Sequence, residues 1–161
     1  MEGLLRDADL ALYTAKARGR GQAVQFAPDM YAAMVERRVL EAALRDGLAR
    51  GEFRLLYQPI VDLATGALRG AEALVRWQHP ARGLVGPAHF IPLAEETGLV
   101  VPLGRWVLEQ ACREAAGWEG AGADAYVTVN VSGRQLARGE FVGEVRAALA
   151  ASGLDPARLT L

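Results

Sequence analysis

The sequence predicts an α/β fold in which an antiparallel hairpin opens a sheet that continues with parallel strands. Two segments of strand character, 53–63 and 68–77, are joined by a short connection, which predicts an antiparallel hairpin. Beyond them, strand-like segments at 125–132 and 158–161 alternate with segments of helical periodicity. Strands separated by helices pair in parallel, so this pattern, continued, gives either a doubly wound sheet or a barrel.

Composition places the chain among globular proteins and excludes several functions. It has 161 residues, of which 52% are hydrophobic and 23% charged, with a net charge of -1. No basic surface large enough for a DNA or RNA polymer is expected. The single cysteine, Cys112, rules out an internal disulfide. There is no apolar run of membrane-spanning length and no export signal, which favours the cytoplasm.

The first fifty residues predict two helices around a short strand. Leu5, Ala8, Leu12 and Ala15 recur at helical spacing, which indicates a helix over 3–18 that ends at the glycines of 19–21. A short strand is expected at 23–26. A second helix, over 29–50, follows Pro28. These segments carry too little apolar surface to form a domain alone.

The remaining elements follow from turn residues and periodicity. A turn at 64–66 joins the two strands of the hairpin, and a loop rich in glycine and proline is expected at 79–87. A short helix at 88–96, ended by Gly98, precedes a longer helix at 103–118. The strand at 125–132 leads to a helix at 138–151 and to the start of a strand at 158–161.

The second hairpin strand carries an unusual pair of charges. Because strand side chains alternate between faces, Glu72, Leu74 and Arg76 share one face. Burying charge is costly unless the charge is paired or bound to a ligand. The pair therefore indicates either a structural ion pair or a site in which a carboxylate holds a cation and a guanidinium grips a phosphate.

The strand at 125–132 has one apolar and one polar face. Its valines alternate with polar residues, and Asn130 lies near the end where the catalytic loops of barrels gather. An amide oxygen beside a carboxylate is a suitable ligand for a hard divalent cation. The alternative is an edge strand whose polar face is simply solvated.

Gln58 precedes Pro59 in the first hairpin strand. Because proline cannot donate a ladder hydrogen bond, this strand is expected at a sheet edge or at a bulge. The Gln58 amide offers both a donor and an acceptor to a base or a phosphate, although such a side chain can also be purely structural.

Four motifs in this order resemble the first half of the EAL domain, the cyclic di-GMP phosphodiesterase family. They are Tyr57-Gln58-Pro59-Ile60, Glu72-Ala73-Leu74-Val75-Arg76-Trp77, Phe90-Ile91-Pro92-Leu93-Ala94-Glu95 and Val129-Asn130-Val131-Ser132. The likeness covers about 36–161. Residues 8–20 resemble the last helix of a GGDEF domain, whose end would be the strand at 23–26.

The resemblance implies a partial (β/α)8 barrel of the TIM type whose first strand runs antiparallel to the others, incomplete in this chain. It divides the chain into a C-terminal remnant of a GGDEF domain (1–27), a connecting helix with the start of the EAL domain (28–51) and the N-terminal half of the EAL barrel (52–161). We accordingly expect the chain to be an internal piece of a longer bacterial signalling protein, with Met1 not its natural start. Upstream regions can tether such a protein to the inner membrane.

The implied activity is metal-assisted cleavage of one phosphodiester of cyclic di-GMP to give linear pGpG, with Mg²⁺ or Mn²⁺ as cofactor. The resemblance makes Glu72 and Asn130 the catalytic metal ligands. The residues that it implies for substrate binding are Gln58, Leu74, Arg76 and Pro92. It also implies cyclic di-GMP as the partner and a homodimer through the EAL domain.

Two alternatives stay open, namely a cyclic di-GMP receptor without activity and a protein-interaction module. Family members carry further carboxylates, a lysine and a paired-aspartate loop that this chain lacks, and the GGDEF signature loop is also absent. The chain alone is therefore expected to be inactive. Because its last strand would present an open sheet edge, the isolated chain is also expected to be poorly soluble or oligomeric.

Overall fold

A computed structural model describes residues 5, 7–9, 11, 12, 15, 21, 23–119 and 124–161, in two compact units, Met1–Ala43 and Leu44–Leu161. In the first unit, the described residues between 5 and 15 are helical, and the rest of the helix expected at 3–18 lies outside the described residues. The strand expected at 23–26 is wrong, since these residues are irregular. A strand needs a partner for its backbone groups, and residues 23–26 pair with no strand of the described chain.

Helix α2, Asp29–Ala49, begins where Pro28 predicts and ends one residue earlier than predicted. It runs from the first unit into the second. Gly51, with φ +69°, follows in the left-handed region that glycine adopts without strain, and the chain then turns into the sheet.

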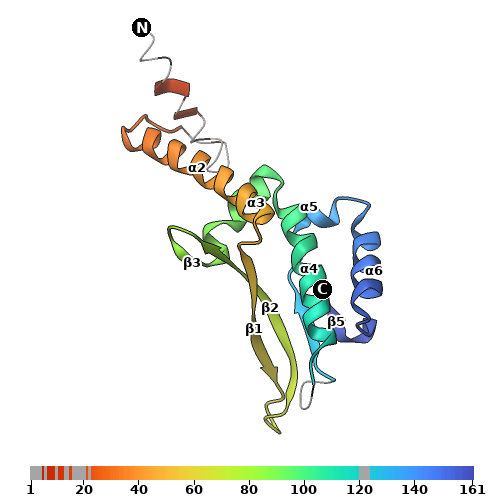
Figure 1. Ribbon diagram of the computed structural model, residues 1–161. Helices are drawn as coiled ribbons and strands as arrows, with labels where there is room; N and C mark the ends of the chain where they lie inside the picture. The colour runs from red at the N-terminus through yellow and green to blue at the C-terminus, as the bar shows by residue number, and fades with distance from the viewer. Residues whose placement is uncertain are drawn as a thin grey trace. The chain divides into compact units, whose positions relative to one another are not determined.

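The second unit is built on one sheet with the order β1-β2-β4-β5, and β3 pairs with β2 off this path (Figure 1). β1 (Phe53–Val61) and β2 (Leu68–His79) form the predicted antiparallel hairpin, and β1 is the expected edge strand. β4 (Tyr126–Val129) pairs in parallel with β2, and β5 (Leu159–Thr160) in parallel with β4. The predicted α/β class with an antiparallel first strand is therefore confirmed.

The hairpin turn is where the sequence placed it. Asp62 Oδ1 accepts hydrogen bonds from the backbone N–H groups of Ala64 (3.1 Å) and Thr65 (3.0 Å). Gly66, with φ +70°, completes the reversal.

Beyond the hairpin, the prediction of a loop over 79–87 is partly wrong. β2 extends to His79, whose Nδ1 accepts hydrogen bonds from the N–H groups of Ala81 and Arg82, and the chain returns as the short strand β3 (Gly83–Val85).

Helices follow at nearly the predicted positions. η1 (Pro87–His89) and α3 (Ile91–Thr97) replace the single helix expected at 88–96, and α4 (Val100–Ala116) begins three residues before the expected helix at 103–118. β4 is shorter than the predicted strand, because the chain leaves the sheet after Val129 to enter α5 (Gly133–Leu136). α6 (Phe141–Ser152) and η3 (Pro156–Arg158) lead to β5.

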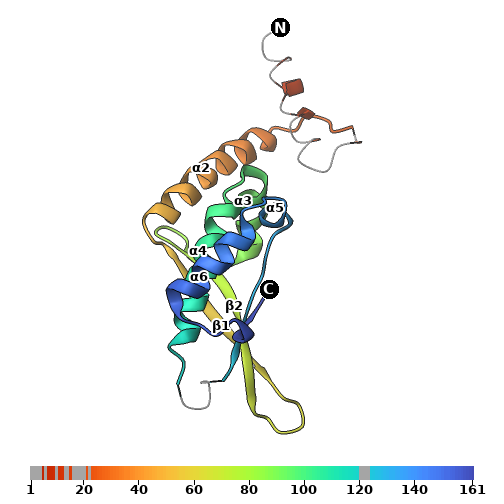
Figure 2. The ribbon, with the colours of Figure 1, turned by 90° about the vertical axis from the view of Figure 1, so that its right-hand side faces the viewer.

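The two faces of the sheet differ sharply. α4 and α6 lie side by side on one face (Figures 1 and 2), and α4 packs on β4. Most strand residues beneath these helices are buried, with exposed fractions of 0% for Trp77 and Val127 and 2% for Val129. The other face of the hairpin carries the polar residues Arg54, Gln58, Glu72 and Arg76 beside Leu56 and Leu74, and all of these side chains are at least partly exposed. The side chains on one face of the sheet therefore pack in the core, and those on the other face remain accessible to a ligand.

Trp77 joins the end of α2 to the sheet. Its indole N–H donates to Glu52 Oε2 at 3.0 Å, and the other carboxylate oxygen of Glu52 accepts from Arg50 at 2.7 Å. A Cβ at Gly47 would lie 2.8 Å from the indole nitrogen, so only glycine lets the helix approach this closely. The hydrogen bonds from Trp77 and from Arg50 lower the pKa of Glu52 below its usual range.

Gly70 lets β4 approach β2. A Cβ at this position would lie 2.6 Å from the carbonyl oxygen of Tyr126 and 2.8 Å from its ring. Gly70 and Tyr126 are register partners in the parallel ladder, so neither backbone can retreat without breaking the pairing that carries Asn130 toward β2.

Gly70→Ala is expected to destabilise the protein by about 2 kcal/mol, because a side chain here meets fixed backbone. Urea unfolding followed by circular dichroism measures the change. The matched control is Gly143→Ala on α6, where an added Cβ meets nothing within 4 Å. A loss for Gly70→Ala no greater than for the control would contradict the close-approach argument.

Glu52→Gln is expected to destabilise the protein at neutral pH and to matter less in acid. Because the pKa of Glu52 is lower in the folded than in the unfolded chain, its stabilisation is complete above the unfolded-state value, near 4.5, and is lost as the pH falls through the folded-state value. Urea midpoints of both proteins between pH 7 and pH 3 measure this, and the difference should shrink on acidification. Glu109→Gln, an exposed carboxylate on α4, serves as control, and a pH-independent gap for Glu52→Gln would refute the assignment.

Candidate functional site

The open face of the sheet gathers most of the predicted site residues. In the β1–β2 ladder, Gln58 lies directly opposite Glu72, and Arg54 lies opposite Arg76. In the β2–β4 ladder, Glu72 pairs with Thr128, so Asn130, two residues further on, belongs to the same face. The backbone register thus brings together side chains from three strands.

The Glu72 and Asn130 side chains meet directly. Asn130 Nδ2 donates a hydrogen bond of 2.7 Å to Glu72 Oε1, across 58 positions of sequence. Asn130 is exposed and Glu72 half-buried, so both side chains remain accessible from the open face. The contact between the carboxylate and the amide is the central geometric feature of the site.

Arg76 takes no part in an ion pair with Glu72. Its Nη1 donates to the backbone carbonyl of Val75 at 2.9 Å, and Glu72 is instead bonded to Asn130. The alternative of an internal ion pair between these two residues is therefore wrong. The guanidinium is half-buried and keeps further donors available to a ligand.

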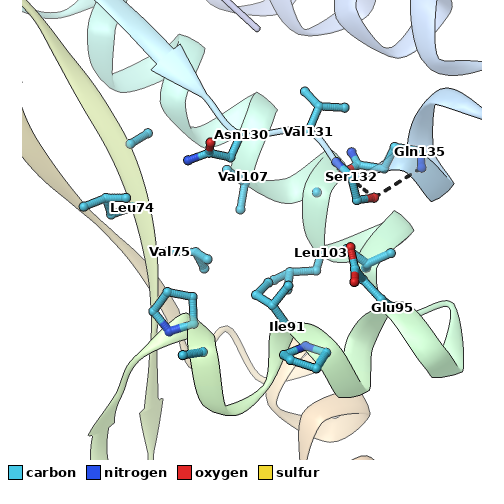
Figure 3. Close-up of a pocket in the computed structure, with 16 residues that line it drawn as sticks. Leu74, Val75, Ile91, Glu95, Leu103, Val107, Asn130, Val131, Ser132 and Gln135 are labelled. Carbon is cyan, nitrogen blue, oxygen red and sulfur yellow. Dashed lines mark hydrogen bonds between the residues drawn. The ribbon is translucent and has the colours of Figure 1, made fainter. Parts of the chain in front are cut away.

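A cavity of about 420 Å³ lies on the helix-covered side of the sheet, where β4 ends and diverges from β2 (Figure 3). Val75 and Ile91 point into it, whereas Leu74 lies on the opposite side of β2. The polar side chains that line the cavity belong to Asn130 and, at one end, to Glu95, Ser132 and Gln135. The full lining is Ala73, Leu74, Val75, Pro87, Ala88, Ile91, Pro92, Glu95, Val100, Leu103, Gly104, Val107, Asn130, Val131, Ser132 and Gln135.

The structure distributes the predicted site residues over two adjoining places. Leu74, Pro92 and Asn130 line the cavity. Gln58 and Arg76 do not line it and lie on the open face of the hairpin, across the sheet from the cavity. Asn130 belongs to the cavity and is bonded to Glu72, so it links the two places.

The polar end of the cavity was not predicted from the sequence. Ser132 and Gln135 form a capping box at the start of α5, a spacing that could have been recognised from the sequence. Glu95 is half-buried and also lines the cavity. Cys112 is fully buried, and burial raises the pKa of its thiol, as expected for a residue that serves packing.

The Glu72–Asn130 pair suits part of a site for a hard divalent cation. A carboxylate and an amide oxygen are ligands that Mg²⁺ and Mn²⁺ accept. Asn130 here turns its Nδ2 toward Glu72, and turning the amide over would present Oδ1 beside the carboxylate. Among the residues that the structure describes, no group of three or more His, Cys, Asp or Glu side chains could hold a metal. These two side chains alone do not complete the coordination shell of such a cation.

None of the helices within the described residues has the length and apolar character needed to cross a membrane.

Comparison with known proteins gives a consistent result. The family described as EAL domain matches residues 41–161. The cyclic di-GMP phosphodiesterase PdeR of Escherichia coli is 47% identical over 134 residues, which are 83% of this chain and 20% of that protein. The bifunctional diguanylate cyclase/cyclic di-GMP phosphodiesterase MucR of Pseudomonas aeruginosa is 43% identical over 159 residues, 98% of this chain and 23% of that protein.

A solved structure described as the PaMucR phosphodiesterase in complex with c-di-GMP superimposes with a TM-score of 0.72 at 45% identity, covering 75% of this chain and 49% of that one. The first curated relatives are much longer than this chain, which spans 19% of two of them and 26% of a third.

Proposed function

Because this chain belongs to the EAL domain family, we propose that the whole protein hydrolyses cyclic di-GMP to linear pGpG, with Glu72 and Asn130 as two ligands of a divalent cation, Mg²⁺ or Mn²⁺. The observation that carries the proposal is the 2.7 Å contact between the Glu72 carboxylate and the Asn130 amide on the open face. The relatives named as cyclic di-GMP phosphodiesterases support the choice of substrate. The domain boundaries at 27/28 and 51/52, including the GGDEF remnant, belong to the same proposal.

The residues around this pair have roles in holding the dinucleotide. Arg76 releases its bond to the Val75 carbonyl and grips a phosphate through two parallel N–H donors. Gln58, directly opposite Glu72, bonds the nucleotide from the neighbouring strand. Leu74, which shares the open face with Glu72 and Arg76, offers an apolar contact to a purine base, and Pro92 borders the adjoining cavity.

Hydrolysis adds the oxygen of one water to a phosphorus, while the 3′ oxygen of the opened ester departs and gains a proton. When bound, a divalent cation lowers the pKa of a coordinated water and neutralises charge on the phosphodiester oxygens. Glu72 and Asn130 place that chemistry at the phosphate that Arg76 orients. Two ligands do not complete such a site, so we expect no hydrolysis by the 161-residue chain alone.

Glu72→Ala in the whole protein is expected to reduce turnover by about a thousandfold or more, since it removes a charged metal ligand. Glu72→Gln keeps an oxygen that can accept from Asn130 but loses the charge, and it should be similarly impaired. The assay is pGpG release from cyclic di-GMP with Mn²⁺, and Glu109→Gln is the control. If both Glu72 variants keep turnover within a few-fold of wild type, Glu72 is not a metal ligand. If the wild-type protein binds cyclic di-GMP without hydrolysing it, the receptor alternative is favoured.

Arg76→Ala is expected to raise the KM for cyclic di-GMP about tenfold, because a charge-assisted bidentate contact with phosphate is lost. The Mn²⁺ concentration for half-maximal activity should stay the same, since Arg76 is not a metal ligand. Arg69→Ala, at the other end of β2 and paired with Asp62, is the matched control. A changed metal requirement with an unchanged KM would contradict the assignment.

A further inference from the structure

Gln135 stands out in the core. Among the residues that the structure describes, it is the one polar residue that is buried, with 4% of its surface exposed. A buried amide is costly unless it is bonded, so this side chain must be held by specific partners. It belongs to α5, a helix of four residues that the chain enters directly after Asn130, Val131 and Ser132.

The partners of Gln135 lie in the turn that follows Asn130. Gln135 Oε1 accepts from the Ser132 backbone N–H at 3.1 Å and from the Ser132 hydroxyl at 3.2 Å. The Ser132 hydroxyl oxygen accepts from the Gln135 backbone N–H at 3.3 Å. These reciprocal bonds fix the backbone at Ser132, while the ladder pairing of Val129 with Ala73 fixes the chain on the other side of Asn130.

Helix α4 holds the Gln135 side chain in place. A Cβ at Gly104 would lie 2.2 Å from Gln135 Nε2 and 2.5 Å from both Cδ and Oε1, so the amide rests against bare backbone. Any side chain at position 104 must displace this amide. Gly104 and Gln135 therefore form one packing unit, which we call the α4–α5 latch.

We infer that Gln135 is a positioning residue for Asn130. The latch fixes the turn at 130–132 and so directs the Asn130 amide to Glu72. This inference rests on the proposed function where it treats Asn130 as a metal ligand. It also makes a structural claim that needs neither metal nor nucleotide.

The structural claim can be tested by selective ¹⁵N-asparagine labelling of the whole protein. The side-chain amide signals of Asn130, the one asparagine of this sequence, are assigned as the pair that disappears in Asn130→Ser. Glu72→Ala provides the reference position of an Asn130 amide without its acceptor. Gln135→Met keeps the side-chain volume but replaces the amide by an apolar thioether that does not replace its hydrogen bonds to Ser132, and in this variant the Asn130 signals should move most of the way to that reference.

Gly104→Ala should cause the same displacement from the other side of the latch. In a protein that already carries Gln135→Ala, Gly104→Ala should shift the Asn130 signals little further, because the Gln135 amide that the new Cβ would contact is absent. Arg134→Ala on α5 and Gly143→Ala on α6 are the controls and should leave the signals unchanged. Unaltered Asn130 signals in folded Gln135→Met and Gly104→Ala proteins, checked by circular dichroism, would overturn the inference.

The functional consequence is tested in the whole protein. Gln135→Met should raise the Mn²⁺ concentration for half-maximal hydrolysis about tenfold, the effect typical of residues that orient metal ligands, with KM at saturating Mn²⁺ unchanged. A metal requirement unchanged from wild type would overturn the inference. If the wild-type whole protein does not hydrolyse cyclic di-GMP, the proposed function fails, and the amide signals alone decide the role of Gln135.

Discussion

The alternation of side chains along β2 is the constraint on which the rest of this structure depends. β2 pairs with β1, β3 and β4, so it is the strand that organises the sheet. Its apolar positions, including Ala73 and Trp77, are buried in the core, while the positions between them carry Glu72 and Arg76. A shift of one residue in its register would bury these charges and expose the core residues. The register that stabilises the fold is therefore the register that presents the site.

Much of this arrangement could be predicted from the sequence, because it follows from local rules. The hairpin, the turn at Gly66 and the parallel strands separated by helices were all recognisable from alternation, turn residues and spacing. The edge position of β1 followed from Pro59, which cannot donate to a ladder. Alternation also placed Glu72 and Asn130 on polar faces, although only the parallel register shows that these faces are one.

The elements that could not be predicted are short or depend on distant partners. α5 has four residues and β3 has three, which is too few for periodicity to be visible. Residues 23–26 have strand-like composition but lack a pairing partner in the described chain, and composition alone cannot supply one. The choice for Glu72 between an ion pair with Arg76 and a ligand site was likewise open, because the contact with Asn130 that excludes the ion pair spans 58 positions.

A site on the face of a sheet needs a further anchor for any site residue that lies beyond the end of a strand. Glu72 lies within the paired part of β2, and its direction is set by ladder hydrogen bonds on both sides. Asn130 lies one residue beyond the end of β4, where the ladder no longer constrains it. Loop residues at such a position lose precision unless a second anchor follows within a few residues. The buried Gln135 amide, which bonds Ser132 and rests on Gly104, is an anchor at that distance, and this explains why the core contains a polar side chain there at all.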